Sequence, residues 1–505
     1  MSVINIIKLM MASTLTCMVY ACDFTEKNID PNSPTSIEPG PLLTYTQLHT
    51  TTGGIAKNIQ VGTCMMLVQQ AASLNNDMPG DKYYQMESYA NTFFTDTYSD
   101  LIKNWRELEE KASSDAKYSN ILGATKIWGA YLFQRLTDIY GNVPYSEAGL
   151  GYYQQIYKPK YDNQETIYKD MIQQVKDGVN LLNANNPAID GDLFYDGDIN
   201  KWKKFGGSLL LRIGMRLSEV APDLAKQTVA DAVTIGVMSQ PEDICLLRHD
   251  GSGKNAFKNP LSFRYLDDNF IESDAVKIGK TFMDYLTKDP RIHVYCSLKD
   301  GNTEFDKQFG LPNGYDSHTI ADAPSGSFVG LENTSNFNIN TILRLDAPTI
   351  FLMPSETKLL LAEAVLRNWT NGNAEVLYKE AITSSMKEQE IAYGTQGKIT
   401  DEEIETYLAQ NLFSTANNTE KLQIIGEQYW VATFINGYES YANWRRTGYP
   451  KLIPTNYSGS MSPGVIPTRL PYPTDEYSIN RANVDTANQQ QGADKVTTHI
   501  WWDID

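Results

Sequence analysis

Residues 354–389 contain two helical patterns in direct succession, and they constrain the fold more than any other part of the chain. The first, PSETKLLLAEAVLRNW, opens with Pro354 at a position suited to the first turn of a helix, with Glu356 also in that turn. Gly372 follows, and then the second pattern, AEVLYKEAITSSMKEQ. Small residues allow the two helices to approach closely: Ala362, Ala364 and Ala381. The segment therefore predicts an antiparallel helical hairpin with a three-residue Asn-Gly-Asn link.

Four further segments carry helical periodicity. Residues 121–141, 163–183 and 199–220 place apolar side chains three or four positions apart, which is the spacing of one helix face. Residues 421–448 are predicted to form one last long helix. The helical segments occur in pairs without a strict repeat length. The chain is therefore predicted to be all-α, built from degenerate tetratricopeptide-like helix pairs.

Long irregular stretches separate these helices: residues 75–84, 243–273, 291–344 and 452–505. Loops of this length inside a compact domain are usually functional or disordered. These stretches hold many of the Tyr, Asn and Asp residues, and loops beside a rigid scaffold often carry binding groups. We therefore expect the long loops to form a ligand-binding face.

The beginning of the chain has the pattern of a lipoprotein signal. Residues 1–21 combine Lys8 with a short, mostly apolar run that is too short to span a bilayer. Ala21 precedes Cys22, as a small residue precedes the lipidated cysteine of a bacterial lipobox. We expect lipidation of Cys22, residues 22–40 as anchor and flexible linker, and one folded domain over 41–505. The alternative is an ordinary signal peptide with a cysteine nearby.

Charge and cysteine content exclude several classes of protein. The net charge is −18 and the sequence pI is about 4.8, which argues against nucleic acid and against electrostatic docking on anionic lipid. Beyond the signal and the lipidated position, three widely spaced cysteines remain: Cys64, Cys245 and Cys296. An odd number at such spacing excludes a disulfide framework and gives no zinc pattern.

Motifs for catalysis, metals or cofactors are lacking. The five histidines include no pair at a zinc-binding spacing, and no G-x-S-x-G elbow is present. The sequence GSGKN at residues 251–255 fails as a phosphate loop because Arg248 stands where the first glycine belongs. DGDIN at residues 196–200 fails as a calcium loop because Lys201 occupies the glycine position, so Asp198 is expected to cap the next helix. We expect no metal, no cofactor and no catalytic residue.

Seven segments in chain order together resemble one family, the SusD/RagB outer-membrane nutrient-binding lipoproteins, and best match its SusD-like subgroup. They cover nearly all of the mature chain: NIDPNSPT (28–35), RLTDIYGNVPYSEA (135–148), LFYDGDINKWKKFGGSLLLRIGMRLS (193–218), DPRI with a downstream LPNGY (289–292 and 311–315), APTIFLMPSETKLLLAEA (347–364), NGYESYANWRRTGYPKL (436–452) and RLPYPTDEYSINRANV (469–484). The large and charged residues of these motifs are expected to be structural. Four are expected to brace the scaffold, namely Trp202, Phe205, Arg212 and Arg216; three to stack and cap a helix end, namely Trp444, Arg445 and Arg446; and four to pin an extended C-terminal return, namely Arg469, Pro471, Tyr472 and Pro473.

The resemblance implies a function as well as a fold. Family members are non-catalytic α-helical lipoproteins that sit over a SusC-type TonB-dependent transporter of the outer membrane. They bind a nutrient, usually an oligosaccharide and sometimes a peptide, and face the cell exterior. The resemblance thus implies a lipid-anchored glycan-capturing protein with a transporter as its partner.

Three loop groups are the candidates for ligand contact, because tyrosine rings can stack on sugar C–H faces while Asn and Asp bond hydroxyl groups. The groups are Asn75, Asp81, Tyr83 and Tyr84; then Tyr265, Asp268, Asn269 and Phe270; then Asn313 and Tyr315. For each residue the competing interpretation is loop packing or contact with the transporter.

Three alternatives remain open. A peptide-binding member of the same family would carry the same signatures. An all-helical glycoside hydrolase would need two carboxylates facing a substrate, and 61 Asp and Glu residues are available. A purely structural partner of a transporter would bind no soluble ligand.

Overall fold

The computed structural model describes residues 37–51, 55–78, 80–254, 257–267, 276–410 and 413–504. Pro39–Asp505 forms one compact unit, and Met1–Glu38 is a separate one. Cys22 lies outside the described residues, as do Asp268, Asn269 and Phe270.

The α-helices of the large unit are α2 (Pro39–His49), α3 (Glu87–Asp96), α4 (Lys103–Ser113), α5 (Ser119–Tyr140), α6 (Gly151–Gln154), α7 (Gln164–Leu181), α8 (Ile199–Arg216), α9 (Pro222–Ile235), α10 (Pro260–Asp267), α11 (Lys280–Tyr285), α12 (Ile292–Tyr295), α13 (Pro354–Leu366), α14 (Ala374–Tyr393), α15 (Asp401–Ala409), α16 (Asn418–Ala432), α17 (Gly437–Thr447), α18 (Glu476–Ile479) and α19 (Arg481–Gln491). Two π-helical segments, η1 (Ile55–Met65) and η3 (Thr97–Ile102), accompany them.

The strands are short and occur in two-stranded antiparallel pairs. The pairs are β1 (Ala71–Ala72) with β5 (Lys277–Ile278), β2 (Val143–Pro144) with β3 (Tyr161–Asp162), β4 (Cys245–Leu247) with β8 (Thr349–Leu352), and β6 (Cys296–Ser297) with β7 (Asn336–Phe337). Three of the four pairs join segments at least 39 positions apart, whereas β2 and β3 pair across 17 to 19 positions.

The hairpin predicted at residues 354–389 is confirmed. Pro354 occupies the first turn of α13. Asn373 caps α14, because its side chain accepts hydrogen bonds from the backbone N–H of Glu375 at 2.9 Å and of Val376 at 3.2 Å. Ala362, Ala364 and Ala381 are buried, as close packing of the two helices requires.

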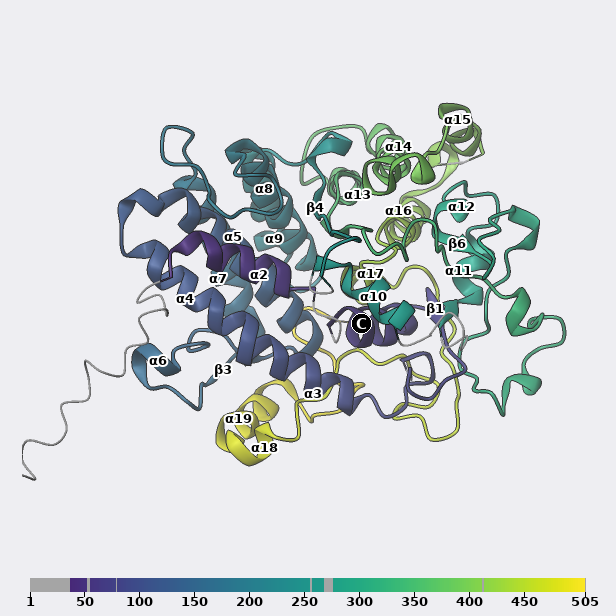
Figure 1. Cartoon of the computed structure of the whole chain (residues 1–505), viewed down its shortest axis with the longest axis horizontal. Coiled ribbons are helices and arrows are strands. Elements are labelled where there is room, and N and C mark those ends of the chain that lie inside the picture. The colour runs from purple at the N-terminus through teal and green to yellow at the C-terminus, as the bar shows by residue number, and fades with distance from the viewer. Residues whose placement is uncertain are drawn as a thin grey trace, which may run out of the picture. The chain divides into compact units, whose positions relative to one another are not determined.

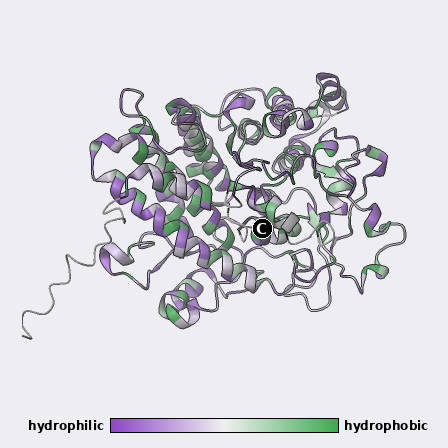
Figure 2. Ribbon diagram, viewed as in Figure 1, coloured by the Kyte–Doolittle hydropathy of each residue, from purple (hydrophilic) through white to green (hydrophobic). Residues whose placement is uncertain are grey.

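Further helix pairs accompany it: α5 packs with α7, α8 with α9, and α16 with α17. Figure 1 shows α5, α7, α8 and α9 together in one group and α13, α14 and α16 in another. Asn163 caps α7 and Asp198 caps α8, as expected for Asp198. The outer helices alternate between hydrophilic and hydrophobic residues in Figure 2, as one-sided burial requires. The all-α, tetratricopeptide-like fold is confirmed.

The single long helix predicted for residues 421–448 is wrong, because the structure has two helices there. The chain leaves α16 at Thr433, and Ile435 adopts a positive φ of 69°. Gly437 then begins α17 against the backbone carbonyl of Gln60, where any side chain would collide. The Asn436-Gly437 pair marks this break, although the apolar periodicity runs through it.

Residues 452–505 were expected to be irregular, but α18 and α19 lie within them. In α19 only Val484 and Ala487 are buried, so the segment has almost no apolar periodicity by which to recognise it. The other long stretches also hold short elements, such as β4 and α10.

The core of the unit contains ion pairs as well as apolar side chains. Trp202 and Phe205 are fully buried. Arg212 donates to Glu356 at 2.5 and 2.8 Å, and Arg216 donates to Glu439 at 2.7 Å. These contacts join α8 to α13 and α17, so these four motif residues brace the scaffold as expected. The three cysteines Cys64, Cys245 and Cys296 are free and buried.

Candidate functional site

The loop at residues 75–84 is held by a buried carboxylate. The Asp81 side chain accepts hydrogen bonds from the backbone N–H of Gly314 at 3.1 Å and of Ser73 at 3.4 Å. It also pairs with the buried Lys82 at 3.0 Å. Burial raises the pKa of Asp81, and Lys82 counteracts this. The bond to Gly314 brings the first and third predicted groups together, although 233 positions separate the two residues.

A third segment, from the C-terminal stretch, completes the arrangement. The hydroxyl of Thr455 donates to the Asp81 carbonyl at 2.7 Å, and Met461 N–H donates to the Tyr83 carbonyl at 2.7 Å. The ring of Tyr457 lies edge-on to Tyr84 with 5.8 Å between centroids. Three segments far apart in sequence therefore meet in one place.

Three partly exposed tyrosines lie at this junction. Tyr84, Tyr315 and Tyr457 are all partly exposed, as is Asn75, while Asn76 is exposed. We call these five residues the tyrosine face. The Tyr457 hydroxyl donates to Asp316 Oδ2 at 2.7 Å, which links it to the turn that carries Tyr315. Tyr315 packs beside the small apolar cluster of Ala72, Leu74 and Leu311, so its ring has a firm base.

Hydrogen bonding fixes the charge state of the Asp316–Tyr457 pair. The Tyr457 hydroxyl and Thr319 hold the pKa of Asp316 well below its usual value. The same hydrogen bond raises the pKa of Tyr457, so this phenol stays neutral and acts as a donor. The pair therefore fixes the Tyr457 hydroxyl at the turn that carries Tyr315.

Three of the predicted contact residues have buried side chains. Asp81, Tyr83 and Tyr265 are at most 2% exposed. Asp81 and Tyr83 hold the loops, and Tyr265 packs on Phe337 with 5.8 Å between ring centroids. Asn313 is half-buried, and its side chain donates to the Ala71 carbonyl at 2.7 Å. Asp81, Tyr83 and Asn313 thus connect the segments that carry the face, whereas Asn75, Tyr84 and Tyr315 lie on it.

The sequence interpretation missed Tyr457, Asn76 and Asp316 as members of this site. The available signal was the position of Tyr457 and Asp316 in long loops already assigned to ligand contact. What was lacking was any sign that residues 455–457 return to the loop at residues 75–84.

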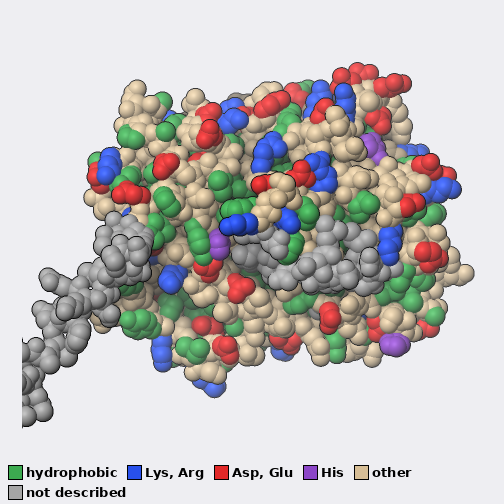
Figure 3. All heavy atoms as spheres, viewed as in Figure 1, with side chains coloured by type: hydrophobic (Ala, Val, Ile, Leu, Met, Phe, Trp, Pro, Cys, Tyr) green, Lys and Arg blue, Asp and Glu red, His purple; other side chains and the backbone are tan. Residues whose placement is uncertain are grey.

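The described part of the chain holds no group of three or more side chains that suits a metal ion. None of the described helices is long and apolar enough to cross a membrane. Figure 3 shows acidic and basic side chains dispersed over the visible face. The side chains of the tyrosine face themselves offer aromatic rings for stacking and amide and hydroxyl groups for hydrogen bonding.

Comparisons with known proteins identify the family of the chain. Residues 31–473 match the SusD-like family described as "Starch-binding associating with outer membrane". A solved chitin-binding protein is 32% identical, with a TM-score of 0.81 over 93% of this chain and 100% of its own. The solved Bacteroidetes AC2a SusD-like protein is 25% identical, with a TM-score of 0.82 over 93% of this chain and 100% of its own.

A chitin-binding SusD homolog from Flavobacterium johnsoniae, at 23% identity and a TM-score of 0.76, covers 92% of this chain and 98% of its own, and it shares the fold. No match was found among curated proteins. The family model spans most of the chain, and the solved relatives share its fold. The chain therefore belongs to the SusD-like family of starch-binding proteins that associate with the outer membrane.

Proposed function

We propose that this protein is a non-catalytic, lipid-anchored lipoprotein that captures an oligosaccharide at the tyrosine face. In this proposal Cys22 carries the lipid, the body faces the cell exterior, and the cargo passes to a SusC-type TonB-dependent transporter in the outer membrane. The observation that carries the proposal is the set of three partly exposed tyrosines, fixed by hydrogen bonds among three distant segments.

The chemistry of the face suits a sugar chain. Tyrosine rings offer flat apolar surfaces to the C–H faces of sugar rings, and Asn75 and Asn76 can bond hydroxyl groups at the rim. Each neutral hydrogen bond contributes only about 0.5–1.5 kcal/mol net. A few such contacts give modest affinity, which suits cargo that must be released to a transporter. The chitin-binding relative at 32% identity supports a glycan as cargo over a peptide.

The test is a calorimetric titration of the chain, purified in detergent, against chitin and starch oligosaccharides and against a peptide panel. We expect saturable binding to one glycan class with no release of reducing ends. Tyr84→Ala, Tyr315→Ala and Tyr457→Ala should each weaken binding by about 1 kcal/mol or more, which is about fivefold. Binding to peptides alone would move the protein to peptide capture, and release of reducing ends would revive the hydrolase alternative.

Tyr152→Ala is the matched control. Tyr152 is 88% exposed and lies on α6, outside the three segments of the tyrosine face. Its loss should leave glycan binding unchanged. If Tyr84→Ala, Tyr315→Ala and Tyr457→Ala all bind glycan as tightly as the unchanged protein and the Tyr152→Ala control do, the tyrosine face is not the binding site.

A further inference from the structure

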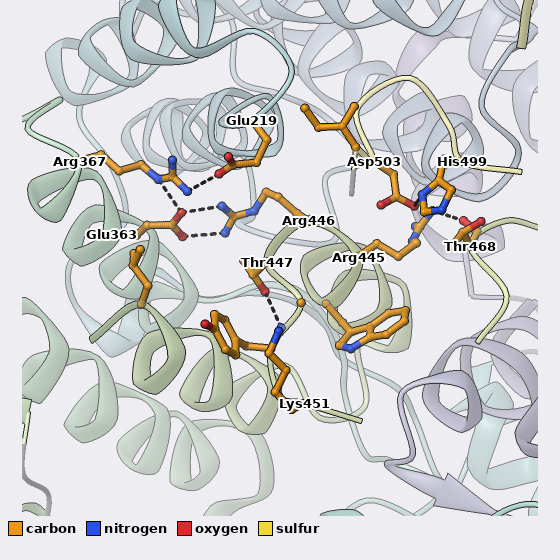
Figure 4. Close-up of a pocket in the computed structure, with 15 residues that line it drawn as sticks. Glu219, Glu363, Arg367, Arg445, Arg446, Thr447, Lys451, Thr468, His499 and Asp503 are labelled. Atoms are coloured by element: carbon orange, nitrogen blue, oxygen red, sulfur yellow. Dashed lines mark hydrogen bonds and ion pairs between the residues drawn. The ribbon is translucent and has the colours of Figure 1, made fainter. Parts of the chain in front are cut away.

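Two of the cavities outside the tyrosine face differ in what their side chains leave unsatisfied. The first, of about 520 Å³, lies at the C-terminal end of α17, and Figure 4 shows the ion pairs among its side chains. Arg446 donates to both oxygens of Glu363, at 2.6 and 2.7 Å. Arg367 donates to Glu363 at 2.9 Å and to Glu219 at 2.5 Å. These charges satisfy one another and need no ligand.

The second cavity has a volume of about 430 Å³, which is within the range of small-molecule sites, roughly 300–1,000 Å³. Its lining comes from α12, α15 and the short helical turn η7 (Phe305–Lys307). Figure 1 shows α12 and α15 toward the same end of the unit, away from α5 and α7. The cavity shares no lining residue with the tyrosine face, so it is separate from the glycan site proposed above.

The buried side of this cavity is fixed by a chain of hydrogen bonds. Arg291 donates to both oxygens of Asp289, at 2.9 and 2.6 Å. The same guanidinium donates to Gln428 Oε1 at 2.8 Å, and Gln428 Nε2 donates to the Tyr407 hydroxyl at 2.8 Å. Tyr407 lines the cavity and is therefore held in place before any ligand arrives.

The side formed by α15 is fixed by the cap of that helix. Glu403 accepts hydrogen bonds from the backbone N–H of Thr400 at 2.8 Å and from its hydroxyl at 2.7 Å. Asp289 and Glu403 thus already have partners. Of the three carboxylates in the lining, this leaves Glu402, which is exposed.

The remaining polar side chains of the lining have no hydrogen-bond or ion-pair partner among the described residues. They are Lys288, His293, Thr303, Glu402 and Thr406. This set supplies both donors and acceptors, and its two charges are of opposite sign. Phe305 adds an aromatic ring that is 45% exposed, and Ile292 adds buried apolar surface. Such a lining suits a neutral polyhydroxylated molecule better than an ion.

We propose that this cavity is a second saccharide-binding site. A sugar ring packs on Phe305 and Tyr407, because aromatic rings offer flat apolar surfaces to its C–H faces. The hydroxyl groups of the sugar bond the free side chains of His293, Glu402 and Thr406. The choice of a saccharide rests on the proposed function, which supplies the class of ligand, whereas the site itself has its own residues.

Histidine resonances report on the two sites separately. His293 lines the cavity, and His318 lies in the turn that carries Tyr315. The chain has five histidines, so histidine labelling gives few signals. The test is an NMR titration of the full, histidine-labelled chain in detergent with chitotetraose, maltotetraose and a peptide panel. We expect the His293 ring signals to shift saturably with one of the two glycans.

Variants separate the cavity from the tyrosine face. Phe305→Ala should weaken the binding reported by His293 about fivefold, because the stacking surface is lost. Thr406→Val should weaken it about threefold, because one hydroxyl is lost. Neither should change the melting temperature, since both side chains are exposed. Phe257→Ala, which removes another exposed phenylalanine outside the cavity, should change nothing, and Tyr84→Ala should leave the response of His293 intact.

The outcomes distinguish this proposal from glycan capture at the face. If His293 stays unmoved by glycan while Tyr84→Ala abolishes the binding measured by calorimetry, the second site is refuted and the proposed function stands. A His293 response that is lost in Tyr84→Ala, that is unchanged in both Phe305→Ala and Thr406→Val, or that occurs with peptides alone would also overturn it. A response of His293 with glycan binding insensitive to Tyr84→Ala would support the cavity and refute the face. Silence of both glycans in NMR and calorimetry would overturn both proposals.

Discussion

The α13–α14 hairpin and the tyrosine face are held by contacts of very different range in sequence. In the hairpin, Ser355 donates to Glu388 across 33 positions, at 2.8 Å from its N–H and 2.6 Å from its hydroxyl. In the face, Asp81 accepts from Gly314 across 233 positions, and its carbonyl accepts from Thr455 across 374. The hairpin is therefore encoded locally, whereas the face exists only once distant segments have met.

We therefore expect substitutions in the two regions to affect stability and ligand affinity differently. Loss of a scaffold contact should lower the stability of the whole unit and leave the affinity of the folded protein unchanged. Loss of a junction contact should instead disturb ligand affinity more than it disturbs global stability.

The largest expected effect is that of Glu439→Gln in the scaffold. Glu439 accepts from Arg216 at 2.7 Å and from the Tyr429 hydroxyl at 2.7 Å. Burial alone raises the pKa of Glu439, but Arg216 and Arg212 outweigh it and hold that pKa below its usual value. Removal of the charge takes one carboxylate partner from each of two buried arginines, Arg212 and Arg216. The free energy of unfolding should therefore fall by about 3–5 kcal/mol. Urea unfolding measures this.

Glu405→Gln is the control for Glu439→Gln, because Glu405 is an exposed carboxylate on α15. It should alter stability by less than about 0.5 kcal/mol. A Glu439→Gln protein as stable as the unchanged one would show that the buried ion pairs contribute nothing to holding α8 against α17.

The next effect depends on pH and lies in the hairpin. Burial raises the pKa of Glu388 to about 7, although Ser355 and Ser384 donate to it. The folded state therefore keeps this proton over a range in which the unfolded chain, with a pKa near 4.5, has lost it. The stability from Glu388 is present in full below pH 4.5 and is lost as pH rises through 7, by up to about 3 kcal/mol.

Glu388→Gln isolates this contribution, since glutamine cannot lose a proton. Melting temperatures of the variant and the unchanged protein, measured from pH 5 to pH 9, should converge or cross as pH rises. A constant difference between them across that range would show that Glu388 is charged in the folded state at all of these values.

The helical scaffold was predictable from sequence because each element carries its own signals. Asp198 and Pro354 mark the beginnings of α8 and α13, and apolar spacing marks the buried face. The break at Ile435 was missed because apolar and aromatic residues continue through it. In α19 too few side chains are buried for any period to appear.

The tyrosine face was predictable only in part. The tyrosine-rich and asparagine-rich loops indicated Asn75, Tyr84 and Tyr315. No local pattern shows that Asp81 faces inward to bind Gly314, or that Tyr457 returns to Tyr84. Exposed and buried tyrosines in loops have the same sequence neighbours, so the distinction between Tyr83 and Tyr84 requires the three-dimensional contacts.

Asp81→Asn should separate the two regions. The substitution weakens the bond to Gly314 N–H and removes the charge opposite the buried Lys82. We expect global stability to fall by about 2 kcal/mol, since Lys82 keeps its bond to the Ser73 carbonyl at 2.6 Å. Glycan affinity should fall more steeply, and amide exchange should increase in residues 75–84 and 313–316 while α13 and α14 stay protected.

Asp77→Asn is the matched control, because Asp77 is exposed in the same loop. It should preserve both affinity and exchange. Equal acceleration of exchange in the face and in the hairpin of Asp81→Asn would mean that the two regions unfold as one cooperative unit.

The smallest effect tests orientation within the face. Tyr457→Phe keeps the ring and removes the hydroxyl that donates to Asp316 at 2.7 Å. Stability should fall by no more than about 1 kcal/mol, because Tyr457 is partly exposed and only one hydrogen bond is lost. The pKa of Asp316 should rise toward its usual value, since the Tyr457 hydroxyl is the largest cause of its depression. Carboxyl carbon NMR titration measures this directly.

Glycan affinity of Tyr457→Phe should fall less than that of Tyr457→Ala, which also loses the stacking surface. An unmoved Asp316 pKa would mean that Thr319 and the backbone N–H of His318 hold the carboxylate without Tyr457. Equal affinity losses in the two variants would mean that the ligand requires the hydroxyl and not the ring.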